Sequence, residues 1–300
     1  DVYKRQALHP AFDVSCWIRH AHRNAHVGRW MKTVMNPQSH LTVFHVDAFV
    51  SRGFLGNVAC VVPLKEWLDD NELLRIAAEN AVPETAYIVK SGNEYQLRWF
   101  TPDIEMDLCG HATLAAGHVV LSELELASEH VMFSSVSGPL KVSRKDNKYA
   151  MHLPIRRPEP ATLPDSIGKS LNIQPLEVLK ARDYVLVYDN QEDIANITID
   201  RPVFDQINLG TGGVIVTAPG ISCDFVSRFF TPQATILEDP VTGSAHCSLA
   251  PYWAKHMGQT DLHARQLSAQ GGELQCFVHS ETVEIVGAAQ TSNEGHIAVN

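Results

Sequence analysis

The sequence lacks the features that mark several common classes of protein. No apolar run approaches the ~18 residues that a membrane-spanning helix needs, and the richest stretch, Leu114 to Leu126, is interrupted by two glutamates and a histidine. Positive charge is scarce, since 24 Lys and Arg stand against 34 Asp and Glu for a net charge of −10. This balance argues against nucleic acid or an anionic membrane as the main partner. We therefore expect neither partner.

Recognisable metal and disulfide patterns are also missing. The six cysteines contain no C-x-x-C pair or zinc-type spacing, and the 15 histidines include no H-E-x-x-H. Scattered cysteines in a chain of 300 residues are typical of reduced thiols in a cytosolic protein. We therefore predict a cytoplasmic location and no bound metal.

Residues 1–40 differ in composition from the rest. They carry six Lys or Arg against two Asp, and they show no clear helix or strand period. We interpret them as a disordered leader or an artefact upstream of a start at Met31 or Met35. An Arg-rich transit peptide is the alternative.

The chain does contain a repeat. Arg-Trp-Phe-Thr-Pro at 98–102 recurs as Arg-Phe-Phe-Thr-Pro at 228–232, and each copy is followed by a Gly-x-Ala step, at 110–112 and 243–245. Three hundred residues suggest about two domains. The repeat therefore predicts two similar domains whose shared cleft is built from equivalent, chemically diverged positions.

The residue pattern of each copy predicts a strand, a hairpin and a helix. In the first copy we expect strands at 41–50 and 58–62, and Pro63 should end the second of these. A helix should follow from Asp69 or Asp70 to about Asn80. We then expect a hairpin of 85–89 with 96–100 and a helix over 110–124. In the second copy we expect strands at 213–218 and 223–230 and a helix from about Gly243. Four prolines between Pro154 and Pro164 indicate a linker. Because alternating βαβ periodicity is absent, a doubly wound parallel sheet is not expected.

The two Gly-x-Ala steps suggest where chemistry could occur. A helix start offers unpaired N–H groups and about half a positive charge, so two starts facing one cleft could bind a carboxylate or stabilise an enolate. The alternative is that small residues only allow close helix packing.

Side chains with chemical potential differ between the copies. The first offers Cys109 and His111, and the second offers Asp239 with nearby hydroxyls. Capping or packing roles are the alternative for these residues. Glu84, ahead of an apolar strand, is either a solvated strand end or, inside a closed cleft, a desolvated base usable near neutral pH.

These residues together resemble the phenazine biosynthesis PhzF-like family, relatives of diaminopimelate epimerase, and are most like its animal members. The motifs that carry the resemblance are Asp47–Phe49, Gly56–Ala59, Glu84–Ala86, Trp99–Pro102, Cys109–Thr113 and Glu238–Ala245.

The resemblance implies an α+β fold of two similar domains, each a β-barrel-like sheet around a central helix, here 41–155 and 165–289. It implies a proton-shifting isomerase that needs no cofactor and acts on a small carboxylate substrate, in a possible homodimer. Glu84 would be the acid/base, and His111 and Asp239 would position substrate and proton. Substrate contacts would come from Asn57, Gly110, Gly243 and Ser244.

Two other functions stay open. A cysteine-type epimerase needs one thiol per half, but the repeat offset places Thr242 opposite Cys109. A catalytically silent binding protein on the same fold is the other alternative.

Overall fold

The computed structural model describes residues 39–299. The expectation of a disordered or artefactual leader therefore lies outside the described residues, apart from the first two residues of β1 (Ser39–Val50). None of the described helices is long and apolar enough to cross a membrane.

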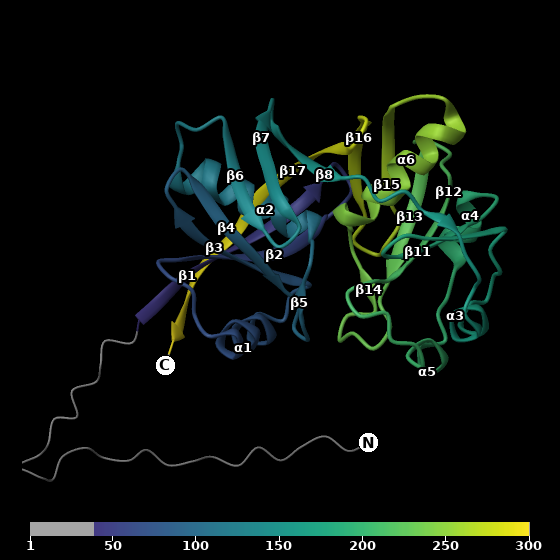
Figure 1. Cartoon of the computed structure of the whole chain (residues 1–300), viewed down its shortest axis with the longest axis horizontal. Coiled ribbons are helices and arrows are strands. Elements are labelled where there is room, and N and C mark those ends of the chain that lie inside the picture. The colour runs from purple at the N-terminus through teal and green to yellow at the C-terminus, as the bar shows by residue number, and fades with distance from the viewer. Residues whose placement is uncertain (1–38, 300) are drawn as a thin grey trace, which may run out of the picture. The chain divides into compact units, whose positions relative to one another are not determined.

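Eight strands of the sheet close into a barrel (Figure 1). In order of pairing they are β1, β2 (Asn57–Leu64), β3 (Glu84–Ser91), β4 (Glu94–Phe100), β6 (His130–Ser135), β7 (Gly138–Lys145), β8 (Lys148–Pro154) and β17 (Thr282–Val299). Contrary to the sequence-based expectation, Pro63 does not end β2. Pairing with β1 stops at Val61, so beyond that residue β2 has β3 as its neighbour and can accept a residue without an N–H.

The second half repeats the same pairing pattern. Its strands are β10 (Glu177–Lys180), β11 (Tyr184–Val187), β12 (Val214–Pro219), β13 (Phe225–Phe230), β15 (Asp261–Gln266) and β16 (Gly272–Val278), followed by β17. As in β1-β2-β3-β4-β6-β7-β8, the successive pairs are antiparallel, parallel, antiparallel, parallel, antiparallel and antiparallel. The proline-rich segment contains the short strand β9 (Glu159–Pro160), which pairs with β10.

The arginine of the repeated sequence block makes the same ion pair and the same aromatic contact in both halves. Arg98 on β4 pairs with Glu105 on β5 (Glu105–Met106) at 2.7 Å and lies over the Phe100 ring. Arg228 on β13 makes the same 2.7 Å contact with Glu238 on β14 (Glu238–Asp239) and lies over Phe230. The block therefore fixes a short strand beside each hairpin, and these short strands lead to the helix starts.

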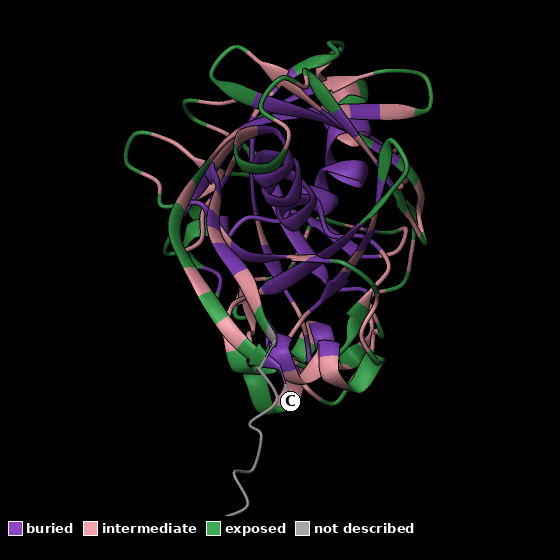
Figure 2. Ribbon diagram, turned by 90° about the vertical axis from the view of Figure 1, so that its left-hand side faces the viewer, coloured by how far each residue is buried: buried purple, intermediate pink, exposed green. Residues whose placement is uncertain are grey.

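One apolar helix runs inside the eight-stranded barrel. All ten residues of α2 (Gly110–Val119) are buried, and the helix continues as a π-helical turn, η1 (Val120–Leu124). Figure 2 shows this buried helix enclosed by strands. A helix that is apolar all round is expected in such a core. The corresponding helix of the second half is α6 (His246–Met257), and its expected start at Gly243 is a 3-10 turn, η2 (Gly243–Ala245).

Four shorter or peripheral helices complete the described elements. Only α1 (Asp70–Asn80) was predicted, and Asp69 caps it by accepting from the N–H of Asn71 at 2.9 Å. The others are α3 (Asp165–Ser170), α4 (Gln191–Asn196) and α5 (Arg201–Phe204). They are too short to show a helical period in the sequence.

The last strand joins the two halves. The first part of β17 pairs with β8 and β16, whereas the part from Ala288 to Val299 pairs with β1. Residue 289, where the resemblance placed the end of the second domain, therefore lies within a continuous strand that closes the eight-stranded barrel.

Candidate active site

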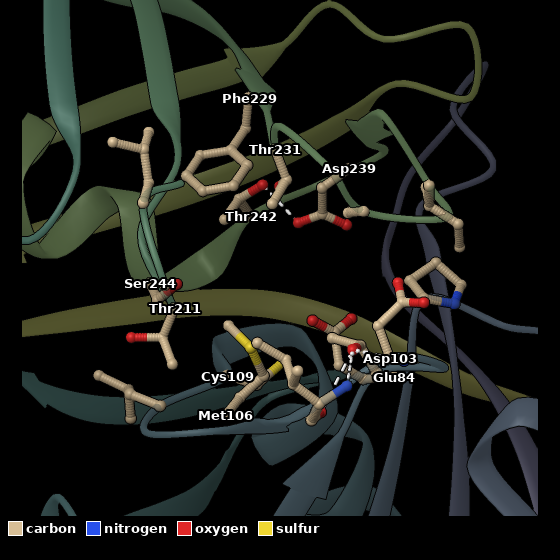
Figure 3. A pocket seen from close by; sticks show the side chains of 18 of the residues that line it. Glu84, Asp103, Met106, Cys109, Thr211, Phe229, Thr231, Asp239, Thr242 and Ser244 are labelled. Atoms are coloured by element: carbon tan, nitrogen blue, oxygen red, sulfur yellow. Dashed lines mark hydrogen bonds between the residues drawn. The ribbon is translucent and has the colours of Figure 1, made fainter. Parts of the chain in front are cut away.

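A pocket of about 260 Å³ lies between the two halves and is lined by equivalent elements of both (Figure 3). Thr101 and Pro102 line it from the first repeat block, and Thr231 and Pro232 from the second. The apolar residues of its wall include Met106, Leu108, Leu209, Phe229 and Ile236. The pocket therefore lies where the repeat predicted a cleft.

The two helix starts meet at this pocket. A Cβ atom added to Gly110 would lie 2.7 Å from the backbone N of Ser244, and one added to Gly243 would lie 3.1 Å from the Cα of Gly110. Glycine is therefore required at these positions for the close helix packing that the sequence analysis gave as the alternative to an anion-binding role. Neither Cys109 nor Thr242 caps its helix through a side-chain hydrogen bond. Both starts line the pocket, so the anion-binding interpretation remains compatible with the packing.

Glu84 and His111 lie together on the first half's side of the pocket. Glu84 opens β3 and is buried, and its Oε2 is 3.1 Å from Nε2 of the buried His111. Neither atom has a hydrogen-bond partner of good angular geometry. A desolvated carboxylate with an unsatisfied oxygen next to an imidazole is suited to exchanging a proton.

The strand register shows that Glu84 has no counterpart in the second half. Thr85 pairs with Phe100, and Val214 pairs with Phe230, the equivalent phenylalanine of the second block. The residue equivalent to Glu84 is therefore Gly213. This agrees with the absence of an acid in the second copy, so the site has a single carboxylate at this position.

Asn57 connects the two halves at the pocket. Its Nδ2 donates to Oδ1 of Asp239 at 2.6 Å and to the carbonyl of Val241 at 3.0 Å, and it lies 3.2 Å from Nδ1 of His111. Thr242 Oγ1 donates to the other Asp239 oxygen at 2.5 Å, the bond drawn in Figure 3. Asp239 is thus held in place by one residue from each half.

Burial dominates the electrostatics of the Asp239 carboxylate. Burial, followed by the negative charge of Glu84, raises the pKa of Asp239 to about 6, although His111, Thr242 and Asn57 act in the opposite direction. For His111, burial lowers the pKa, but interactions with the Cys109 sulfur and the Glu84 carboxylate raise it, and the balance lies well above its usual range. Asp239 is therefore a group that can change protonation near neutral pH.

The thiol at the site is poorly suited to act as a base. Burial raises the pKa of Cys109 to about 11, so the group is a neutral thiol near pH 7. Its counterpart, Thr242, also lines the pocket but carries a hydroxyl. This donor chemistry bears on metal binding as well. Ligand atoms of Glu84, Cys109 and His111 lie within 4.8 Å of one another, so these side chains could hold a metal ion if the thiol released its proton on binding.

Sequence reasoning missed Arg182, which also lines the pocket. Its guanidinium donates to the Asp183 carboxylate at 3.0 Å, to Ser244 Oγ at 3.1 Å and to Asp107 Oδ1 at 3.3 Å. Arg182 therefore connects the loop before α2 to the start of the second half's helix. It lies outside both repeat blocks, and the only signal in the sequence is an adjacent Arg-Asp pair.

Asp103 and Thr235 join the two halves at the edge of the pocket. Oδ1 and Oδ2 of Asp103 accept from Thr235 Oγ1 and from the Thr235 backbone N–H, both at 2.8 Å. Asp103 follows the first Thr-Pro pair, and Thr235 follows the second. Two hydrogen bonds between exposed residues thus connect the loops that follow the two repeat blocks.

The structure thus brings together every site residue predicted from the sequence. Glu84, His111, Asp239, Gly110, Gly243 and Ser244 line the pocket, and Asn57 lies behind it as the bridge between His111 and Asp239. Met106 occupies the register position equivalent to Asp239, since they pair with Trp99 and Phe229 respectively. The acid is therefore present on one side only.

Comparisons with known proteins agree with this architecture. Residues 46–295 match the family model described as phenazine biosynthesis-like protein, PhzC-PhzF. An uncharacterized isomerase of Pseudomonas aeruginosa is 48% identical, covering 83% of this chain and 95% of its own. A human phenazine biosynthesis-like domain-containing protein is 34% identical, with 85% and 98% covered, so the bacterial protein is more similar than this animal one. The crystal structure of a PhzF family protein from Enterococcus faecalis has a TM-score of 0.79 and 42% identity, covering 87% of this chain and all of the other.

Proposed function

Because the chain belongs to the phenazine biosynthesis-like PhzC-PhzF family, we propose that it is an isomerase that moves a proton by carboxylate acid–base catalysis. The substrate would be a small carboxylate, and the reaction would need neither a metal nor an organic cofactor. Relatives with 36–48% identity are named isomerases. The observation that carries the proposal is the buried Glu84 carboxylate, 3.1 Å from His111, in a pocket that also contains Asp239.

In the proposed reaction Glu84 takes a proton from a carbon next to an acidifying group of the substrate. The electrons of the broken C–H bond move into that group to give an enolate-like intermediate. The proton then returns to a different carbon as the electrons move back. The product has the same atoms as the substrate, so no oxidant, reductant or second substrate is needed.

The surroundings of Glu84 support this role. Residues at the starts of α2 and η2 line the pocket, and the N–H groups of a helix start can stabilise negative charge that develops beside it. The His111 ring beside Glu84 can compensate for charge as the carboxylate gains or loses a proton. Asp239, with a pKa of about 6, can hold a proton that the intermediate receives or releases.

The pocket also supports the substrate class. Its volume of about 260 Å³ suits a small molecule. The helix starts favour an anion on one side, and Phe229 and Met106 offer an apolar surface for the carbon skeleton.

The experiment follows proton exchange in D2O. Candidate small carboxylates are incubated with the protein, and NMR records deuterium uptake at carbon together with any new isomer. We expect Glu84→Gln to slow both by at least ~10²-fold, the lower end of general-base effects. Glu94→Gln, an exposed glutamate at the start of β4, is the matched control and should react normally. Normal exchange in Glu84→Gln would rule out its role as the base.

A further inference from the structure

A second cluster of ligating side chains lies away from the pocket. Ligand atoms of His152, His279 and Glu284 all lie within 4.8 Å of one another. His152 is on β8, Glu284 is on β17, and His279 follows β16. These strands are neighbours where the two halves join (Figure 1), and none of the three residues lines the pocket.

The sheet register holds two of these residues side by side. Glu284 pairs directly with His152 across the antiparallel β8–β17 ladder, which places their Cβ atoms about 5 Å apart on one face. On the other side of β17, Glu284 pairs with Phe277, two residues before His279. The backbone N–H of His279 donates to Thr282 at 2.9 Å, which fixes the turn that carries the imidazole.

The Glu284 carboxylate has one oxygen engaged and one facing the cluster. Oε1 accepts from Lys145 at 2.6 Å, whereas Oε2 lies 3.8 Å from Nε2 of His279. The separation of 3.8 Å is too long for a hydrogen bond. A cation bound by both atoms would occupy the space between them, while Lys145 would orient the carboxylate as outer partners commonly do in metal sites.

We propose that His152, His279 and Glu284 form a binding site for a divalent transition-metal ion such as Zn²⁺. Two imidazoles and one carboxylate are a common protein ligand set for this ion. His279 is about half exposed and Glu284 is 16% exposed, so water can fill the remaining positions. Mg²⁺ and Ca²⁺ prefer oxygen ligands and should bind poorly. A bound ion would fasten the β16–β17 turn to β8, where the two halves meet.

The test is calorimetric titration of the full-length, metal-stripped protein with Zn²⁺, with Mg²⁺ as a parallel titrant. We expect a site of one equivalent for Zn²⁺ that His279→Gln and His152→Gln each weaken at least about tenfold. His279 is exposed, so its replacement should leave the circular dichroism spectrum and melting temperature of the metal-free protein unchanged.

Two control variants distinguish this site from other groups that bind zinc. His20→Gln with His22→Gln removes the H-x-H of residues 20–22, and Glu84→Gln alters the cluster in the pocket. Both should keep the one-equivalent site. The proposal is overturned if wild-type protein binds no Zn²⁺, if His279→Gln binds it as tightly as wild type, or if the site disappears in either control.

Discussion

Gly110 and Gly243 meet backbone to backbone where the two halves of the molecule join. A Cβ on Gly110 would be 2.8 Å from the Cα of Gly243 and 2.7 Å from the Ser244 backbone N. Real Cβ atoms are not found at such distances from backbone, and neither helix start can move without disturbing the other. The geometry of the proposed anion site therefore depends on two residues that have no side chain.

Replacing Gly110 by alanine should separate the helix starts and damage both stability and activity. We expect the free energy of unfolding to fall by about 1–3 kcal/mol or more, as in other overpacked cores. Urea denaturation measures this change. Gly295→Ala is the control, because a Cβ there meets nothing within 4 Å. Equal stability of the two variants would contradict the close contact.

Asp239→Asn should stabilise the protein near neutral pH while impairing catalysis. Burial raises the pKa of Asp239 from 3.8 to about 6. An acid whose pKa is raised on folding binds protons more tightly in the folded state, so stability falls as pH rises from about 4 to 6 and stays lower above that range. Asparagine does not ionise, so the variant should gain up to ~3 kcal/mol at pH 7.

The measurement for Asp239→Asn is the difference in unfolding free energy between wild type and variant from pH 4 to pH 8. The difference should be small at pH 4, grow up to pH 6 and then level off. A variant that is less stable at pH 7, or a difference independent of pH, would show that folding does not raise the pKa of the Asp239 carboxylate.

Arg182→Met should destabilise the protein by about 3–5 kcal/mol. The change leaves Asp183, which is 1% exposed, as an unpaired buried charge. Adding Asp183→Asn should recover part of the loss, because the charge is removed while the side-chain oxygen can still accept from Gly213 N–H. Thermal or urea unfolding of the two single variants and the double variant tests this. Purely additive losses would argue against the ion pair as the source of stability.

Asp103→Ala should loosen the edge of the pocket without unfolding the protein. Asp103 and Thr235 are exposed and joined by two hydrogen bonds, so we expect less than ~1 kcal/mol of lost global stability, typical of surface interactions. Hydrogen exchange of the Thr235 amide should become faster. Asp146→Ala, at an exposed turn between β7 and β8, is the control and should leave that amide unchanged.

Much of the fold could be predicted because the repeat is local and physically specific. The block around Arg98 recurs around Arg228 since both arginines serve the same ion pair and aromatic contact. The α2 helix and the β3–β4 hairpin were predicted for similar local reasons, namely apolar composition and a Ser-Gly-Asn turn. The short helices of the second half and the course of β2 through Pro63 were not, because they depend on which strands lie beside them.

The sequence by itself determined the repeated block, the two glycine helix starts and the candidate residues Glu84, His111 and Asp239. These are properties of residue type and order along the chain. Tertiary structure alone decided that Asn57 reaches Asp239 across 182 residues and that Arg182 reaches Ser244. It also decided that β17 closes the barrel of the first half. Each of these relationships depends on how distant strands pair, which no local pattern encodes.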